Sequence, residues 1–273
     1  MFSTITLEEK NKIVELYQGG MGATGIAALI KRSETFIKYN LKKLGVPIRT
    51  MDKYRKYTLN PNYFDSIDTQ EKAYWLGFLF ADGCNYENRN EVKLCLKESD
   101  AHHIERFKLA IGANQPLVHN AGNIRDGTTQ VTICNKNFSA SLARLGCIQN
   151  KSLVLQFPKI PKKYLAAFML GAFDGDGCIC AHGPIFSVTG SYDFITGYQQ
   201  ALIDNCRLNK TKVSTKKELV PTGLREKAWS LRYCGKGNCQ KIRDFLYSGR
   251  INCYLPRKHE KFEAILNDLT QGN

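Results

Sequence analysis

The sequence predicts an α+β fold made of two similar halves and preceded by a small all-helical domain. Three observations lead to this prediction. One segment occurs twice, the same alternation of helical and strand-like stretches follows each copy, and the N-terminal region has helical patterns alone. With 273 residues, 43% of them hydrophobic, the chain is large enough to bury a core. A disordered basic tail is therefore excluded.

The chain is strongly basic. Its 39 Lys and Arg against 25 Asp and Glu give a formal net charge of +14. Residues 1–60 hold eleven Lys and Arg and five Asp and Glu, so six of these charges lie in under a quarter of the length. A folded chain with this excess is expected to bind a polyanion, and charge alone does not distinguish DNA from RNA.

Several classes of protein are disfavoured by simple patterns. The longest apolar runs, Ala73–Ala81 and Tyr164–Phe173, are too short to cross a bilayer, and the first four residues do not resemble a signal peptide. The ten cysteines are scattered singly and form no CxxC pair, which disfavours structural zinc and favours reduced thiols. We therefore expect a cytoplasmic protein without membrane association.

The N-terminal domain is predicted to span residues 1–48. Leu7–Tyr17 has a helical pattern, Thr24 can cap a short helix, and Ser33 can cap another that ends at Gly45. Two short helices joined by a brief turn are typical of a helix-turn-helix, and the alternative is a three-helix bundle with a solvated basic face. The outward residues of the last helix include Glu34 and the candidate DNA contacts Thr35, Lys38, Tyr39 and Lys42.

A basic linker is predicted at residues 49–66, because this stretch lacks hydrophobic periodicity and carries several cationic residues. Arg55 within it is a further candidate DNA contact.

An internal repeat begins after the linker. A shift of 94 residues places Ala73–Cys84 on Ala167–Cys178, with six of twelve positions identical, where fewer than about one match is expected by chance. The predicted repeats span residues 67–158 and 159–273. Each copy continues with a strand, a helix, a hairpin turn and a closing helix. In the first copy these are predicted, in this order, at Glu91–Lys97, Ala101–Ile111, Asp126-Gly127 and Phe138–Leu145. In the second they are predicted at Pro184–Thr189, Tyr192–Asn205, Pro221–Gly223 and Gln240–Leu246.

The repeated segment is predicted to be a helix in both copies. Asp68–Glu71 has the form of a capping box, and Pro161 suits a first helical turn. Small residues recur every four positions, which lets two helix backbones approach closely. These stripes are Ala73, Gly77 and Ala81 in the first copy and Ala167, Gly171 and Gly175 in the second.

If the two stripes pack together, Asp82 and Asp176 lie side by side at the helix C-termini. Two carboxylates there repel each other and the negative end of the helix dipole, so a cation is expected between them. Mg²⁺ accepts carboxylates and free helix-end carbonyls, here those of Ala81 and Gly175, and Mn²⁺ is expected to substitute. Such an ion supports phosphodiester hydrolysis. The alternative for each Asp-Gly pair is a simple C-terminal turn.

These residues resemble a known family. Trp75–Gly83 and Met169–Gly177 are similar to the two motifs of single-chain LAGLIDADG (dodecapeptide) homing endonucleases, although Phe80 replaces the sixth-position acid that Asp174 keeps. The segment Asn60–Asp68 resembles the lead-in of phage-type members with an N-terminal helix-turn-helix. The resemblance covers about residues 63–265 and implies a bacterial or phage-infected host cell.

The resemblance implies two αββαββα halves whose motif helices meet at the interface, with a saddle of antiparallel strands in the DNA major groove. Strand positions that face the DNA alternate along each strand. A solvated surface role is the alternative for every Lys and Arg among them. The candidate contacts are Tyr86, Asn88, Arg89, Asn90, Lys93, Lys97, Arg125 and Gln130 in the first repeat, and Cys180, His182, Lys212, Lys216, Arg225 and Arg232 in the second.

The family also places a basic residue beside the scissile phosphate at the end of each repeat. Lys151 and Lys258 stand in the corresponding segments, with Arg257 as the alternative in the second. The resemblance implies that they stabilise the transition state or activate water. A phosphate contact without a catalytic role is the alternative.

The resemblance implies a site-specific double-strand DNA endonuclease that leaves short 3′ overhangs. Its catalytic residues would be Asp82, Asp176, Lys151 and Lys258. Its partner would be double-stranded DNA with a long, pseudo-palindromic or asymmetric target, without an obligate protein partner. An RNA-splicing maturase and a catalytically inactive DNA-binding regulator on the same fold remain alternatives, although retention of both acids favours the enzyme and the helix-turn-helix favours DNA.

Overall fold

The computed structural model divides the chain into two compact units, residues 1–56 and 57–273. It describes residues 5–48, 57–121, 127–180, 183–220, 223–249 and 251–268, without the side chains of residues 152, 216–220, 223–227 and 268. The linker positions 49–56, including Arg55, lie outside the described residues. The domain boundaries drawn from the sequence at 48, 66 and 158 stay predictions.

The described part of the N-terminal unit contains helices only, which confirms its all-α character. They are α1 (Leu7–Gln18), α2 (Ala23–Leu29) and α3 (Glu34–Lys43). Their buried side chains form a core of their own, comprising Ile13, Tyr17, Ile26, Ala27, Ile37 and Leu41.

Local capping fixes the helix starts in this unit. The Ser33 hydroxyl accepts from Phe36 N–H and caps α3, as predicted. The predicted cap at Thr24 is wrong, because α2 begins one residue before it, with Gly22 at the cap position. Thr24 instead donates to Glu34 across the turn, over 2.9 Å.

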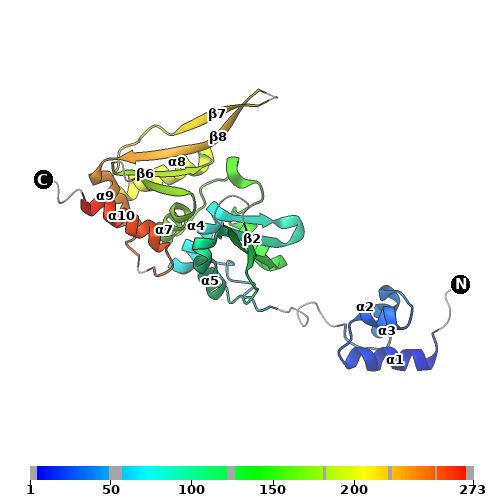
Figure 1. Cartoon of the computed structure of the whole chain (residues 1–273). Coiled ribbons are helices and arrows are strands. Elements are labelled where there is room, and N and C mark those ends of the chain that lie inside the picture. Colours follow the sequence, from blue (N-terminus) through cyan, green and yellow to red (C-terminus); the bar gives the residue numbers. More distant parts are fainter. Residues whose placement is uncertain are drawn as a thin grey trace. The chain divides into compact units, whose positions relative to one another are not determined.

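The second unit contains the same succession of elements twice, which confirms the α+β prediction (Figure 1). In the first repeat these are α4 (Gln70–Asp82), β1 (Gly83–Tyr86), η2 (Glu87–Arg89), β2 (Glu91–Lys97), η3 (Glu98–Asp100), α5 (Ala101–Ala110), β3 (Val118–Asn120), β4 (Thr128–Cys134), α6 (Lys136–Arg144) and η4 (Lys151–Leu153). In the second they are η5 (Lys162–Tyr164), α7 (Leu165–Asp176), β5 (Gly177–Cys180), β6 (Ile185–Gly190), α8 (Tyr192–Cys206), β7 (Ser214–Val220), β8 (Gly223–Cys234), α9 (Lys236–Leu246) and α10 (Pro256–Asp268).

Each repeat forms one four-stranded antiparallel sheet. The strand orders, β1-β2-β4-β3 and β5-β6-β8-β7, are the same in both. Side chains alternate between the core and the open face, so that Val92, Leu94 and Leu96 are buried while Lys93 and Lys97 lie on the other face of β2. The first sheet therefore has a face at β2 that carries cationic side chains.

The helices α4 and α7 pack against each other more extensively than any other pair of helices (Figure 1). Glycines allow this approach. A Cβ atom at Gly77 would overlap the Phe168 carbonyl oxygen, and one at Gly171 would overlap the Tyr74 carbonyl oxygen. Backbone thus meets backbone at the centre, as the stripes of small residues predict.

Several predicted details of the second unit differ from the structure. Helix α4 is capped by Thr69, whose hydroxyl accepts from Lys72 N–H, so the capping box at Asp68–Glu71 is wrong. Strand β1 ends at Tyr86, and the following residues turn through η2 because Asn90 has a left-handed conformation (φ 52°). Helix α10 was not predicted.

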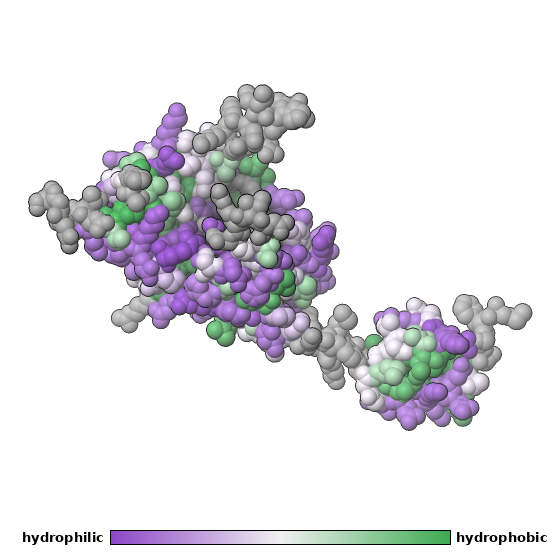
Figure 2. All heavy atoms as spheres, in the orientation of Figure 1, coloured by the Kyte–Doolittle hydropathy of each residue, from purple (hydrophilic) through white to green (hydrophobic). Residues whose placement is uncertain are grey.

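Hydrophilic residues cover much of the visible surface of this unit (Figure 2). Among the described residues, no helix is both long enough and apolar enough to cross a membrane.

The glycine contact gives a stability prediction. Gly77→Ala is expected to destabilise the second unit by about 3 kcal/mol, because two helix backbones must separate to admit the new methyl group. Urea unfolding measures the change. Gly237→Ala is the matched control, since a Cβ there meets nothing within 4 Å in α9 and alanine favours the helix. Equal stability of Gly77→Ala and wild type would contradict the close packing.

Candidate active site at the ends of the paired helices

The two acids that the sequence singles out lie together at the C-terminal ends of the packed helices. Asp82 is the last residue of α4, and Asp176 is the last of α7. A Cβ at Gly175 would lie 3.1 Å from Asp82 Oδ2 and would overlap the Ala81 side chain. Strands β1 and β5 begin at the next residues, so both sheets start from this pair of acids.

Burial and mutual repulsion make this an unfavourable place for negative charge. Loss of hydration is the main cause that raises the pKa of Asp82 to about 6, and the neighbouring Asp176 carboxylate raises it further. Partial loss of hydration also raises the pKa of Asp176, although part of this residue is exposed at the surface. No described residue donates a hydrogen bond to either carboxylate.

Two lysines flank the acids in equivalent ways. Lys151, at the start of η4, donates to the carbonyl of Gly83, the residue that follows Asp82. Lys258, in the first turn of α10, donates to the carbonyl of Gly177, the residue that follows Asp176, over 2.7 Å. Both ammonium groups lower the pKa of each acid and so oppose the effect of burial. The predicted catalytic residues therefore lie in one cluster.

The lysines differ in their surroundings. Lys258 is only 8% exposed and also donates to the carbonyls of Phe173 (2.8 Å) and Gly175 (3.2 Å), while Lys151 is half-buried. Burial lowers the pKa of Lys258 to about 8, against the opposing effect of nearby carboxylates. Arg257, the alternative, turns to Asp100 and pairs with it over 2.6 Å.

A small cavity opens beside the first lysine. Its volume is 300 Å³, and its lining includes Lys151, Asp176 and Ala81 together with the hydroxyl residues Thr189 and Ser191. The Thr189 hydroxyl donates to the Asp176 carbonyl over 3.0 Å. Polar groups of both repeats thus meet in one recess.

Metal ligation at this site depends on oxygen atoms. Among the described residues, no group of three or more His, Cys, Asp or Glu side chains is placed to hold an ion. The donors present are the two carboxylates, which suit a hard divalent cation such as Mg²⁺ if water or phosphate completes the set. Of the two predicted carbonyl ligands, that of Gly175 accepts from the Lys258 ammonium over 3.2 Å.

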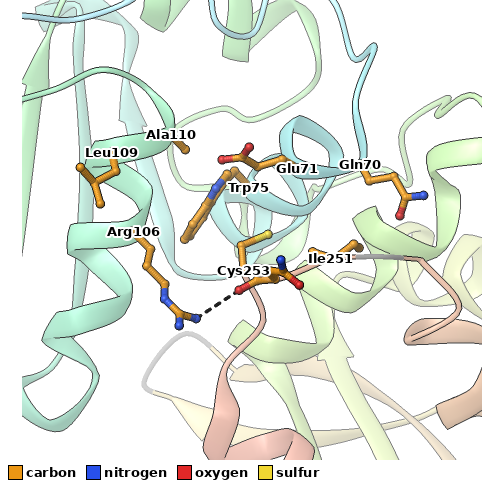
Figure 3. Close-up of a pocket in the computed structure, with 9 residues that line it drawn as sticks. Gln70, Glu71, Trp75, Arg106, Leu109, Ala110, Ile251 and Cys253 are labelled. Carbon is orange, nitrogen blue, oxygen red and sulfur yellow. Dashed lines mark hydrogen bonds between the residues drawn. The ribbon is translucent and has the colours of Figure 1, made fainter.

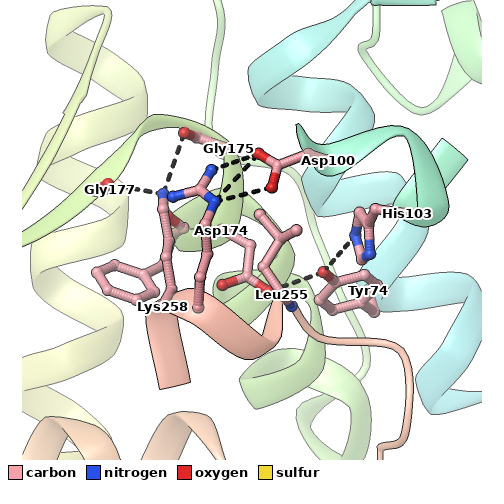
Figure 4. Close-up of polar contacts among 10 residues, drawn as sticks. Tyr74, Asp100, His103, Asp174, Gly175, Gly177, Leu255 and Lys258 are labelled. Atoms are coloured by element: carbon pink, nitrogen blue, oxygen red, sulfur yellow. Dashed lines mark hydrogen bonds and ion pairs between the residues drawn. The ribbon is translucent and has the colours of Figure 1, made fainter. Parts of the chain in front are cut away.

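A buried polar network centred on Asp174 connects α7 to the start of α10 (Figure 4). Asp174 is 1% exposed, and its Oδ2 accepts from the Tyr74 hydroxyl (2.7 Å) and from Leu255 N–H (2.9 Å). His103 Nε2 lies 2.9 Å from the same hydroxyl; because the hydroxyl proton is given to Asp174, this nitrogen donates. Burial raises the pKa of Asp174 to about 7 and lowers that of His103 to about 3.

The sequence analysis assigned no role to this network. The one signal for it in the sequence is Asp174, the acid at the sixth position of the second motif. The first motif has Phe80 at that position. Tyr74 and His103 could not be connected to it from spacing, because His103 lies on α5 and the three residues meet only when the repeats pack.

Some of the candidate DNA contacts in the first repeat lie on the open face of its sheet, and others do not. Lys93 and Lys97 alternate with buried residues of β2, and Gln130 lies beside them on β4. Tyr86 ends β1, with the Lys93 ammonium 5.6 Å from its ring centre. Asn88 and Asn90 are exposed, but Asn88 lies in η2 and Asn90 follows it, so their predicted strand-face placement is wrong. Arg89, a further candidate contact, is exposed in the same turn.

Fewer candidates can be placed on the second sheet. Arg232 is exposed on β8, Cys180 is half-buried at the end of β5, and Lys212 is exposed before β7. The residues Arg125 and His182 lie outside the described residues, as do the side chains of Lys216 and Arg225.

The exposed side of α3 in the N-terminal unit carries all four of its predicted DNA contacts. Lys38 forms an ion pair with Glu34 over 2.5 Å, one turn before it. The four exposed residues are Thr35, Lys38, Tyr39 and Lys42.

A further cavity lies at the opposite end of α4 from the acids (Figure 3). Its volume is 610 Å³, and Glu71, Trp75, Arg106 and Asn252 contribute to its lining. It is remote in sequence along the helix from Asp82, so it has no part in the chemistry at the acids.

Comparison with known proteins gives structural neighbours alone. No protein-family model matches the chain, and no curated protein matches it. The neighbours are LAGLIDADG homing endonucleases and the LAGLIDADG-like WhiA protein, at low identity.

Three solved structures illustrate this similarity. Full-length DUF199/WhiA from Thermatoga maritima has 10% identity and a TM-score of 0.46. The match covers 77% of this chain and 65% of the WhiA chain, so this chain matches less than two thirds of that protein's length. Variants of the homing endonuclease I-DmoI have 14% identity and a TM-score of 0.44, covering 75% of this chain and 99% of theirs. The LAGLIDADG meganuclease I-AabMI, bound to uncleaved DNA, has 11% identity and a TM-score of 0.46, covering 72% and 90%.

The raised pKa of Asp82 gives a pH-dependent prediction. The folded-state value of about 6 exceeds the ordinary 3.8, so the ionised carboxylate opposes folding above pH 6, and this cost disappears as the pH falls towards 4. In EDTA, Asp82→Asn should be more stable than wild type by about 1–2 kcal/mol at pH 7.5 and equally stable at pH 4.

Urea unfolding at the two pH values measures this difference. The exposed carboxyl of Asp204, on α8, supplies the control variant Asp204→Asn, which should show no such pH-dependent gain. A wild type as stable as Asp82→Asn at pH 7.5 would contradict the raised pKa of Asp82 and the cost of ionising this carboxyl in the folded protein.

Proposed function

We propose that this protein is a divalent-metal-dependent, site-specific double-strand DNA endonuclease that acts as a pseudo-symmetric monomer. The observation that carries the proposal is the cluster of two acids and two lysines at the crossing ends of α4 and α7. A chain of net charge +14 places its paired carboxylates where the two sheets start. Negative charge at the centre of a polyanion-binding surface favours metal-assisted hydrolysis over simple binding.

The residues of the cluster fit Mg²⁺, with Mn²⁺ as a substitute. Asp82 and Asp176 would hold it, because their carboxylates accept no hydrogen bond from any described residue. The carbonyl of Ala81 would be a further ligand, and so would that of Gly175 if Lys258 gives up its hydrogen bond to it. When bound, such an ion polarises the scissile phosphate and lowers the pKa of a water nucleophile.

The chain's own residues would orient the substrate. The Lys151 and Lys258 ammonium groups lie beside the two acids, where each can bind one strand's phosphate and stabilise the charge that develops on it. The cationic side chains on the open face of the first sheet, Lys93 and Lys97, and Arg232 on the second, would contact the DNA on either side.

The two repeats would cut one strand each and leave short 3′ overhangs. Their different sequences suit a long target that is pseudo-palindromic or asymmetric, read without a second protein. The N-terminal unit would act as a helix-turn-helix that binds DNA outside the cleavage site.

The acids provide the central test. Asp82→Asn and Asp176→Asn should each abolish double-strand cleavage in Mg²⁺, since a neutral amide cannot replace an anionic ligand, while specific DNA affinity stays within about threefold. The substrate is DNA from the region that flanks the protein's own coding sequence, with cuts mapped by sequencing and binding measured by gel shift. Asp204→Asn is the control and should cut normally.

Cleavage by both acid variants at the wild-type rate would refute the mechanism. Specific binding by a wild type that never cuts would instead identify a regulator, and preference for structured RNA would identify a maturase.

The α3 surface gives a separate prediction. Lys42→Ala should weaken binding to the full target and reduce the slope of log affinity against log salt by about 1, because one phosphate contact is lost. Its cleavage rate at saturating protein should not change. Lys12→Ala, an exposed cation on α1, is the comparison variant. An unchanged salt slope for Lys42→Ala would exclude α3 from the DNA interface.

A further inference from the structure

The pseudo-symmetry of the two repeats is broken at one buried position. The 94-residue shift relates Tyr74 to Phe168 and Phe80 to Asp174. The pair Tyr74–Asp174 and the pair Phe168–Phe80 therefore occupy equivalent places where α4 meets α7. The first pair is joined by a 2.7 Å hydrogen bond, and the second by an edge-to-face ring contact with centroids 5.4 Å apart.

The polar pair is connected to the chain segment that carries Lys258. The Asp174 oxygen that accepts from Tyr74 also accepts from Leu255 N–H, over 2.9 Å (Figure 4). Leu255 immediately precedes α10, and its carbonyl accepts from Lys258 N–H. The carboxylate of Asp174 thus fixes the first turn of α10 against the motif helix.

Contacts from the first repeat reinforce this placement. Arg257 pairs with the buried carboxylate of Asp100, and Arg106 lies 3.4 Å from the carbonyls of Asn252 and Tyr254. The Lys258 ammonium, held by three carbonyls, then reaches the end of α7.

The lysine on the other side is held differently. Lys151 follows Asn150, which has a left-handed conformation (φ 54°), and lies in the short η4 turn rather than in a long helix. Phe80 occupies the position in the first repeat that Asp174 occupies in the second. Its side chain has no polar atom, so it cannot accept a hydrogen bond from the backbone that precedes Lys151, as Asp174 does from Leu255. Among the described residues, the Gly83 carbonyl is the one acceptor that Lys151 reaches.

We propose that Asp174 is a positioning residue for Lys258, and that the two halves of the catalytic site consequently act unequally. Cleavage of the strand served by Lys258 depends on the Asp174–Leu255 hydrogen bond, and cleavage of the strand served by Lys151 does not. This inference rests on the proposed endonuclease function and names a determinant of strand preference within it.

Four variants separate the hydrogen bond to Leu255 from general stability. Asp174→Leu removes the acceptor. Asp174→Asn keeps an amide oxygen for both donors and is the conservative rescue. Tyr74→Phe removes both hydrogen bonds of the hydroxyl, the one to Asp174 and the one with His103, but keeps the contact of Asp174 to Leu255. The double variant Tyr74→Phe/Asp174→Leu makes the pair apolar, as at Phe168 and Phe80, which avoids an unpaired hydroxyl and protects the fold if Asp174→Leu is unstable.

Cleavage of target DNA labelled separately on each strand measures the strand preference. In Asp174→Leu and in the double variant, one strand should be cut about 10- to 100-fold more slowly, since a buried hydrogen bond to the backbone is lost, and nicked DNA should accumulate. Asp174→Asn and Tyr74→Phe should keep the wild-type ratio of the two strand rates. Equal slowing of both strands in the Leu variants would overturn the proposal.

Lysine acetylation followed by mass spectrometry tests the same contact without cleavage. Lys258 should react about tenfold faster in Asp174→Leu than in wild type, because its 8% exposure rises once α10 is released, while Lys151 keeps its rate. An unchanged Lys258 rate would also overturn the proposal. If wild type cuts no DNA, the endonuclease function fails, and the acetylation result still decides whether Asp174 positions Lys258.

Discussion

Backbone contact between α4 and α7 is the constraint on which the rest of the structure depends. Gly77 and Gly171 leave no room for a Cβ atom, so the two helices meet at their main chains and their C-terminal ends emerge together. The sheets begin at the next residue of each helix, and their position follows from the same contact. One pair of glycines therefore fixes both the interface between the repeats and the separation of the two acids.

The charges at these ends are balanced locally within a basic protein. Burial raises the pKa of both Asp82 and Asp176, and the Asp176 carboxylate raises that of Asp82 further. The buried Lys258 and the half-buried Lys151 lower both. The lysines bind main-chain carbonyls rather than the carboxylates, which leaves the carboxylate oxygens free for a cation from solution. The lysines therefore reduce the cost of burying the two acids without occupying their oxygen atoms.

The sequence predicted what depends on local pattern. The motif helices, the strands at residues 91–97 and 185–189, and the positions of Asp82 and Asp176 follow from repetition and periodicity. The pattern of α10 was missed, although Pro256 at its start and the buried Phe262, Ile265 and Leu266 are typical of an amphipathic helix. The contact of Asp174 with Leu255 could not be predicted, because the two residues are 81 positions apart. The end of β1 at Tyr86 was missed because the hairpin loop that follows, η2 and Asn90, carries no Gly or Pro to mark it in the sequence.

The Tyr74–Asp174 pair also limits how the two repeats could be recombined. A symmetric dimer of the second repeat would bury two Asp174 carboxylates, each against a Phe168 ring that offers no proton. A dimer of the first would set each Tyr74 hydroxyl against Phe80. Each motif helix therefore carries the partner that the other requires at this position, and pairing either repeat with a copy of itself would leave buried polar groups without one.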